Sequence, residues 1–244
     1  PNLGQKIHGS SRWIHLGRFS FQPSELLKMS LLIYLAYFLS KKEHIMLSLT
    51  RGYIPFLIII GITSGILLLQ PDFGLAVTLT TTAFMMLFVT HIRFSYLVAT
   101  AAAIIPIIGW LIYTRPYRLR RIMTFINPWN DPQGAGFQVI QSLIAVGSGS
   151  LWGTGVSHSK QKFFYLPMQH TDFIFSIIAE ETGFFGASLL VILFVAVLFI
   201  GLRIAWRLKD SFCALVTFGF IVLTSLQALI NISVALGLVP TKGI

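Results

Sequence analysis

Long apolar runs, separated by short polar segments, dominate the pattern of this chain. A helix that crosses the hydrocarbon core of a bilayer needs about 20 mostly apolar residues, and these runs are apolar on every helical face. The pattern therefore predicts an all-α integral membrane protein, built as a polytopic helix bundle. The predicted spans cover residues 26–40, 53–69, 73–90, 94–113, 173–200 and 212–239.

One connection, residues 114–172, is much longer than the others. Loops of this length are usually functional or disordered. Within it, residues 137–146 are apolar on one helical face but too few to span, which predicts an interfacial or re-entrant helix. The glycine- and serine-rich residues 147–155 that follow predict a flexible stretch. We therefore expect a long loop that carries short interfacial helices.

Composition supports a membrane protein. Hydrophobic residues make up 55% of the 244 residues and charged residues 11%, which is more apolar surface than a soluble domain can bury. The chain begins with Pro1 and no signal peptide opens it, so we expect a fragment of a longer protein. Its one cysteine, Cys213, stands in an apolar run and is expected to be a small core residue. The six histidines lack the spacing of a metal cage.

The net charge of +10 is distributed in a way that predicts orientation. The short segments 40–52, 91–93 and 201–210 carry seven lysines and arginines, whereas the short segments on the opposite side carry four. Because basic residues favour the cytoplasmic side, the loop 114–172 is predicted to be extracytoplasmic. No basic helix with interleaved aromatic residues occurs, so anionic headgroups and phosphorylated lipids are the expected partners, and nucleic acid is not.

Asp172 is the leading candidate for chemistry, because it stands where the long basic loop meets the next span. The alternative is a helix N-cap, a position that aspartate favours. Arg118 and Arg121 belong to a cluster of four arginines in residues 115–121. The planar guanidinium suits phosphate, so the cluster predicts a diphosphate site, with a headgroup-facing cluster as the alternative.

The remaining membrane-depth charges have a structural interpretation beside the functional one. Glu25 and Lys28 are three residues apart and can pair on one helical face. Together with Asp72 and Glu180 they predict a polar network between helices. Intramembrane carboxylates also mark ion pathways, so a transporter fits these residues nearly as well as an enzyme.

Five motifs, in order, resemble those of the SEDS family (shape, elongation, division and sporulation) of peptidoglycan glycosyltransferases. The motifs are G-S-S-R-W-I-H-L-G (9–17), F-Q-P-S-E-L-L-K (21–28), L-Q-P-D-F-G (69–74), the central N-P-W-N-D-P run with its following G-F-Q and Q-S (127–142), and H-T-D-F-I-F to E-E-T-G (170–183). The chain resembles the division branch (FtsW-like) more than the elongation branch (RodA-like), because of residues 161–167 and 240–243. The sporulation branch shares much of this pattern. Met168 departs from the family's usual glutamate, and the family has about ten spans.

The resemblance implies a glycan-strand polymerase that uses lipid II, inverts the anomeric carbon and releases undecaprenyl diphosphate. Asp172 would be the general base on the acceptor hydroxyl. Arg118, Arg121 and Lys162 would bind the diphosphate, with room for a divalent cation, Mg²⁺ or Mn²⁺. The other substrate-binding residues that it implies are Glu25, Lys28, Asp72, His170 and Thr171.

The resemblance also implies partners and a location. They are a class B penicillin-binding transpeptidase, division-site proteins and a multi-pass position in the bacterial cytoplasmic membrane at the division septum. Two alternatives from other functional classes are a flippase for the same lipid-linked precursor and a non-catalytic scaffold that recruits the transpeptidase. A flippase makes no glycan polymer, and a scaffold tolerates loss of Asp172.

Overall fold

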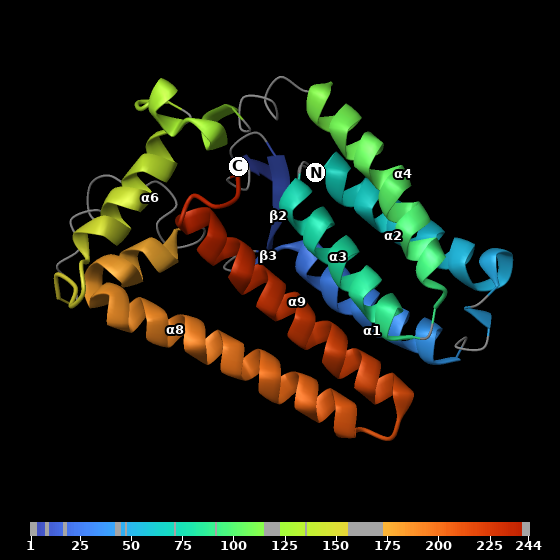
Figure 1. Cartoon of the computed structure of the whole chain (residues 1–244). Coiled ribbons are helices and arrows are strands. Elements are labelled where there is room, and N and C mark those ends of the chain that lie inside the picture. Colours follow the sequence, from blue (N-terminus) through green and yellow to red (C-terminus); the bar gives the residue numbers. More distant parts are fainter. Residues whose placement is uncertain are drawn as a thin grey trace. The chain divides into compact units, whose positions relative to one another are not determined.

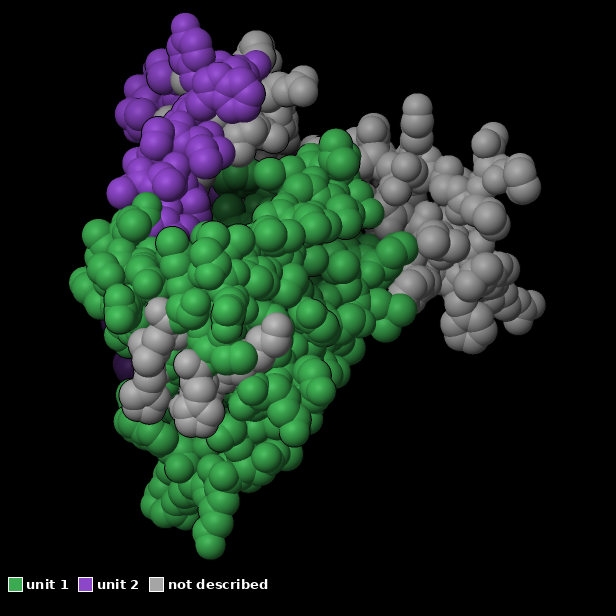
Figure 2. Space-filling view, turned by 90° about the vertical axis from the view of Figure 1, so that its right-hand side faces the viewer, with its two compact units in different colours: residues 1–99, 198–224, 243–244 green, residues 100–197, 225–242 purple. Residues whose placement is uncertain are grey.

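The structure is a computed structural model that describes residues 4–7, 10–16, 19–41, 45–46, 48–70, 72–90, 92–114, 123–134, 136–155 and 173–240. The chain divides into two compact units (Figure 2). Unit 1 comprises residues 1–99, 198–224 and 243–244, and unit 2 comprises residues 100–197 and 225–242. Three helices contribute residues to both units: α4 (Phe94–Tyr113), α8 (Ile174–Arg207) and α9 (Ser211–Ala235).

Three helices build the centre of unit 1. They are α1 (Pro23–Lys41), α2 (Ile54–Leu69) and α3 (Phe73–Val89), and a π-helical turn, η2 (Leu49–Tyr53), leads into α2. The third helix packs against both of the others (Figure 1). Along the chain, α2 follows α1 and runs back in the opposite direction, and α3 then reverses again. The helices α1 and α3 therefore run in the same direction, and their first turns lie at the same end of unit 1.

The core of unit 1 is a continuous apolar cluster. On α1 the buried positions recur every three or four residues, as at Leu32, Leu35 and Leu39, which have no exposed surface. Between them Ile33 and Tyr37 stay about half exposed, so the outward face of α1 is also apolar. A helix that is apolar on both its inner and outer faces is suited to a bilayer.

Helices form at all six ranges where spans were predicted, which confirms the membrane helix bundle. Among the described residues, three segments are long and apolar enough to cross a membrane: Leu49–Leu69, α8 and α9. Shorter apolar helices form at Phe73–Val89, Phe94–Ile107 and Phe137–Ser148. Membrane crossing by α1, α3 and α4 therefore stays a prediction.

The sequence did not reveal a small sheet before α1. The strands β1 (Gly4–Ile7), β2 (Ser10–Leu16) and β3 (Phe19–Phe21) form an antiparallel sheet in the order β1-β2-β3. Gln5 pairs with Trp13, and His15 pairs with Ser20. A signal was present at the turn, since apolar and polar residues alternate over 14–16 and 19–21 on either side of Gly17 and Arg18, a typical hairpin pattern.

The long loop contains the short helix that was predicted within it. Its elements are a 3-10 turn, η3 (Pro128–Asn130), and α6 (Phe137–Ser148), which begins at the predicted residue. At the turn, the Asn127 side chain accepts a hydrogen bond from Trp129 N at 3.2 Å. The carbonyl oxygen of Asp131 accepts from the N–H groups of Gly134 and Gly136. These contacts form a turn of the kind that asparagine, aspartate and proline favour.

One expectation was wrong: Cys213 is exposed rather than part of the core. The range predicted as a span, 173–200, is helical but contains a break that was not predicted. The helix α8 is two segments, 174–182 and 184–207, joined at Gly183. Gly183 has φ 66° and ψ −166°, a backbone region that is essentially restricted to glycine.

Candidate active site

Residues 149–155 close the gap in α8 with their own backbone. The carbonyl oxygens of Glu180 and Glu181, freed by the break, accept hydrogen bonds from Thr154 N at 2.9 Å and Gly155 N at 3.1 Å. The Thr154 hydroxyl also donates to the Glu180 carbonyl, at 3.1 Å. A buried carbonyl without a partner is costly, so the loop restores what the helix loses.

The second half of the helix is satisfied in the same way. Phe184 N donates to the Ser150 carbonyl at 2.9 Å, and Phe185 N donates to the Leu151 carbonyl at 3.4 Å. The Trp152 ring lies 5.0 Å from the Phe185 ring between centroids, so side chains of the loop and the helix also meet here. The stretch predicted to be flexible is thus held by hydrogen bonds on both sides of the break.

Glycines make this contact possible. A Cβ on Gly183 would meet the Gly153 backbone nitrogen and the Leu151 carbonyl, and a Cβ on Gly153 would meet the Glu181 carbonyl. These neighbours are backbone atoms, which cannot swing aside as a flexible side chain can. Gly153 also has a positive φ of 81°. We call residues 149–155 and 179–185 together the glycine joint.

A pair of buried serines ties the start of α8 to two other helices. The hydroxyl oxygen of Ser142, on α6, lies 2.5 Å from that of Ser176, on α8, and 2.6 Å from the Ala235 carbonyl at the end of α9. A hydroxyl has one proton, so Ser142 donates to Ala235 and Ser176 donates to Ser142. The last carbonyls of a helix lack partners within it, and Ser142 supplies one here.

The residue that follows Asp172 is also anchored. Phe173 is 2% exposed and packs with Val234 and Ile230 of α9. Asp172 itself lies outside the described residues, but it directly precedes Phe173 in the sequence. The chain that leaves the candidate catalytic residue is therefore fixed by an apolar contact and, four residues after Asp172, by Ser176.

At the start of α1, Glu25 and Lys28 form the predicted pair. The Lys28 ammonium lies 2.6 Å from a carboxylate oxygen of Glu25, and the lysine side chain is much the more buried of the two, at 11% against 52% exposed. Pairing satisfies the lysine, which has little access to water. The exposed carboxylate of Glu25 faces outward and can still accept hydrogen bonds from a ligand.

Asp72 has a structural role that the sequence did not assign to it. Its carboxylate accepts a hydrogen bond from Leu75 N at 3.0 Å, so it caps the N-terminus of α3. Because α1 and α3 start at the same end of unit 1, Asp72, Glu25 and Lys28 lie at that end together. Binding of substrate by these three residues stays a prediction.

The other candidate site residues lie outside the described part of the chain. They are Arg118, Arg121, Lys162, His170, Thr171 and Asp172. Within the described residues no group of three histidine, cysteine, aspartate or glutamate side chains is placed to hold a metal ion. The donor set for the divalent cation suggested by the sequence is therefore not found among the described residues.

Comparison with known proteins identifies the family. The family model FTSW_RODA_SPOVE, which describes a cell cycle protein, matches residues 2–244. This chain belongs to the FtsW/RodA/SpoVE family. A probable peptidoglycan glycosyltransferase FtsW from Geobacter sp. (strain M18) is 42% identical over 244 residues, and the stage V sporulation protein E of Bacillus subtilis (strain 168) is 43% identical over the same length.

Two solved structures show the same fold. A chain of a peptidoglycan synthase complex, studied for how it coordinates polymerization and crosslinking, has a TM-score of 0.80 and 32% identity, with 99% of this chain and 67% of that chain covered. The rod shape determining protein RodA of Thermus thermophilus has a TM-score of 0.64 and 27% identity, with 98% and 62% covered. The chain covers 66% of the Geobacter relative and 67% of the Bacillus one.

Sequence reasoning did not assign a role to the glycine joint or the serine pair of this FtsW/RodA/SpoVE family member. Gly183 was noted as the end of a family motif, and Gly153 as part of a flexible run. The available signal was a glycine inside a long apolar span together with a glycine-rich loop that precedes it. Glycine at such a position often marks a close approach between backbones.

We predict that Gly183→Ala destabilises the full-length protein. Alanine at this backbone conformation costs about 1–3 kcal/mol in strain, and the clash with backbone atoms adds to it. Gly147→Ala on α6 is the matched control, because a Cβ there meets nothing within 4 Å and alanine favours a helix. Thermal unfolding in detergent should show a lower midpoint for Gly183→Ala alone. Equal midpoints would mean that the joint carries no stability.

Proposed function

We propose that this chain forms the catalytic core of a peptidoglycan glycosyltransferase that polymerises lipid II. The observation that carries the proposal is 42% identity, along the whole chain, to a protein named as a probable peptidoglycan glycosyltransferase. The TM-score of 0.80 to a chain of a peptidoglycan synthase complex supports it. The glycine joint and the serine pair add a physical reason, because they hold the helix that follows Asp172.

The reaction transfers a sugar from a diphosphate to a hydroxyl. The acceptor 4-hydroxyl oxygen attacks the anomeric carbon of the lipid-linked donor, and the bond from that carbon to the diphosphate oxygen breaks with inversion. Asp172 takes the hydroxyl proton as the new bond forms. The bonding pair leaves with undecaprenyl diphosphate, whose added negative charge Arg118, Arg121 and Lys162 stabilise.

The remaining residues position the substrate. Glu25 presents a half-exposed carboxylate in the first turn of α1, and Lys28 holds it in place. Asp72 contributes mainly by fixing the first turn of α3. His170 and Thr171 stand beside Asp172 in the sequence and would orient the acceptor.

A precursor flippase is the alternative from another functional class, and the glycine joint argues against it. In transporters, broken helices commonly offer their freed carbonyl oxygens to the transported ion. Here the carbonyl oxygens of Glu180 and Glu181 accept hydrogen bonds from Thr154 and Gly155. The break in α8 therefore behaves as a structural joint, which suits a helix that must hold a catalytic residue still.

The proposal extends to partners and location. The synthase complex that this chain resembles is described in terms of both polymerization and crosslinking. We therefore expect a class B penicillin-binding transpeptidase as partner, with division-site proteins at the septum of the bacterial cytoplasmic membrane. The identities to the FtsW and sporulation relatives differ by one percentage point, so septal localisation of a fluorescent fusion in vegetative cells is the observation that selects division.

We predict that Asp172→Asn abolishes polymerisation in the full-length protein with its transpeptidase. Asparagine caps a helix about as well as aspartate but cannot act as the base, so the rate should fall ~10²-fold or more. Glycan length from fluorescent lipid II, followed on a gel, measures the effect. Asp131→Asn, in the exposed turn, is the control and should be mild. Polymerisation by Asp172→Asn at the wild-type rate would make Asp172 a cap and leave Glu25 or Asp72 as the next candidate for the base.

We predict that Arg121→Ala weakens the use of lipid II more than Arg207→Ala does. Both changes remove one positive charge, but only Arg121 belongs to the proposed diphosphate site. A charge-assisted hydrogen bond contributes about 1.5–3 kcal/mol, which corresponds to roughly tenfold or more in apparent affinity. The measurement is the lipid II concentration that gives half-maximal polymerisation. Equal effects of the two changes would reduce the outer arginines to a headgroup anchor.

The proposed orientation predicts which cysteines an impermeant reagent can reach. Ser148 and Ser211 are exposed, at the end of α6 and the start of α9. In a Cys213→Ser background, a cysteine at position 148 should label from outside intact cells, and one at position 211 should label after the inner face is opened. Labelling in the reverse sense would overturn the orientation and place the proposed site on the wrong side for lipid II polymerisation.

A further inference from the structure

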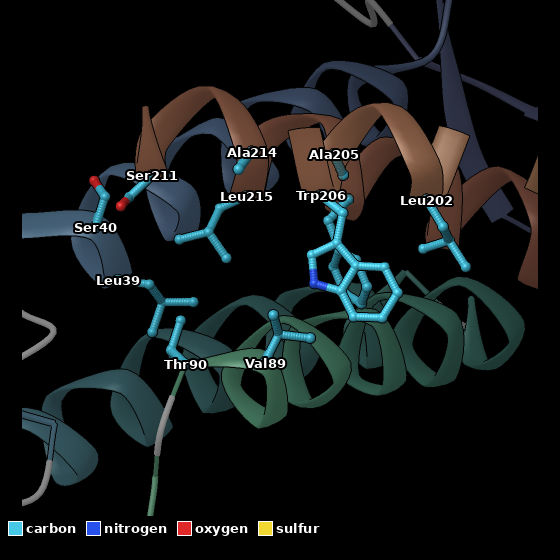
Figure 3. Close-up of a pocket in the computed structure, with 11 residues that line it drawn as sticks. Leu39, Ser40, Val89, Thr90, Leu202, Ala205, Trp206, Ser211, Ala214 and Leu215 are labelled. Carbon is cyan, nitrogen blue, oxygen red and sulfur yellow. The ribbon is translucent and has the colours of Figure 1, made fainter. Parts of the chain in front are cut away.

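A cavity of about 380 Å³ lies within unit 1, in the range of small-molecule sites (Figure 3). The last turns of α1 and α3, the last turns of α8 and the first two turns of α9 surround it. Most of its wall is aliphatic or aromatic, including Leu39, Val89, Leu202 and Phe218. It lies at the opposite end of α1 and α3 from Glu25 and Asp72, so it is distinct from the proposed active site.

The wall contains three hydroxyl groups, those of Ser40, Thr90 and Ser211, and two of them are already used within the protein. Ser40 donates to the Tyr37 carbonyl at 3.0 Å, and Thr90 donates to the Leu87 carbonyl at 2.8 Å. Both protons are therefore used within the residue's own helix or the turn that ends it. A polar ligand would lose its hydrogen bonds to water here and regain few, whereas an apolar chain loses none.

The rim of the cavity is basic. Lys41 follows the lining residue Ser40, Arg207 follows the lining residue Trp206, and Lys209 stands in the turn between α8 and α9. All three are exposed. Anionic headgroups are attracted to such clusters of cations at a membrane surface.

The carboxylate at this rim is already engaged. Asp210 accepts a hydrogen bond from Cys213 N at 3.0 Å and so caps α9. The pKa of Asp210 lies below its ordinary value, first because the Cys213 thiol donates to it, then because of the Cys213 N–H, with a smaller contribution from the charge of Lys41. Ser40 and Ser211 line the same cavity, so Lys41, which follows Ser40, stands at the same rim as the α8–α9 turn with Lys209.

An aromatic side chain marks the level of the interface. Trp206 lines the cavity and is 91% exposed. Tryptophan is enriched where the headgroups meet the acyl chains, because its ring is apolar and its N–H remains polar. An apolar cavity lined by this tryptophan and bordered by basic residues offers both parts of a phospholipid a fitting environment.

We propose that this cavity binds an acyl chain of an anionic phospholipid, whose headgroup Lys41, Arg207 and Lys209 hold at the rim. The site serves a bilayer phospholipid and lies at the end of unit 1 remote from the residues assigned to the lipid II reaction. A free anion in solution would meet the rim but leave the apolar cavity empty. The charge of the headgroup selects the lipid, and the cavity fixes its position.

Native mass spectrometry of the full-length protein tests the cavity. The purified protein is mixed with dioleoylphosphatidylglycerol or dioleoylphosphatidylcholine at equal concentrations, and the lipid retained per protein is compared. The wild type should retain the anionic lipid preferentially. Ala214→Phe fills the cavity and should reduce retention severalfold, whereas Ala102→Phe, the same change on an exposed position of α4, should not. Wild-type retention by Ala214→Phe overturns the proposal.

The rim is tested by removing charge alone. Lys41→Gln and Arg207→Gln should each weaken retention of the anionic lipid about fivefold, the effect of one cation at an anionic surface, and leave the neutral lipid unchanged. Arg51→Gln is the matched control, since Arg51 is exposed on η2 and does not adjoin the cavity. Equal losses for all three changes would mean general surface attraction and would overturn a site.

A photo-crosslink identifies the occupant even where a variant folds poorly. The full-length protein, with p-benzoylphenylalanine in place of Phe218, is irradiated in vesicles of dioleoylphosphatidylglycerol and dioleoylphosphatidylcholine. A mass increase of one phosphatidylglycerol molecule supports the proposal. A crosslink within the protein without added lipid would show that another protein segment fills the cavity, and a phosphatidylcholine adduct in proportion to its abundance would show no headgroup selection. Both of these outcomes overturn it.

Discussion

A bilayer cannot hydrogen-bond an exposed peptide group, and unit 2 depends on how it meets this constraint where α8 breaks. Gly183 interrupts the helical ladder, and residues 149–155 supply donors and acceptors to both sides of the gap. The loop and the break fix each other, since neither has its partners without the other. With the serine pair beside it, this contact sets the first segment of α8 and therefore the chain that leaves Asp172.

The few charged side chains at the proposed catalytic end of unit 1 are divided between structural and accessible roles. Asp72 is used as the cap of α3, and Lys28 is largely buried in its pair with Glu25. Because Glu25 stays about half exposed, water screens its attraction to Lys28, so the position of the pair matters more than its energy. Glu25 is left with an accessible carboxylate, held at the end of the bundle where the proposed reaction would take place.

The sequence predicted the helices, which depend on the average hydropathy of many residues. It did not predict features that depend on a single residue, such as Gly183. Apolar runs located every helix of the bundle, because a span needs about 20 such residues and a single exception does not alter the pattern. The same averaging concealed Gly183. One glycine leaves the hydropathy of α8 nearly unchanged, although its positive φ interrupts the helix. Asp72 was grouped with a polar network because its partner, Leu75 N, is a backbone group that no side-chain pattern reveals. The three strands were not predicted, because each has seven residues or fewer and so gives only a short pattern.

Glu180 is a buried acidic residue at the glycine joint. It is 2% exposed and lies near the end of the first segment of α8, where the helix dipole disfavours a carboxylate. Its place is therefore not explained by the stability of that segment alone. Its carbonyl accepts two hydrogen bonds from Thr154, so its backbone is held from the loop side. Because the backbone of Glu180 is fixed, its buried side chain cannot move out to water. The glycine joint therefore sets the position at which that side chain contacts its neighbours. The participation of Glu180 in a polar network between helices stays a prediction.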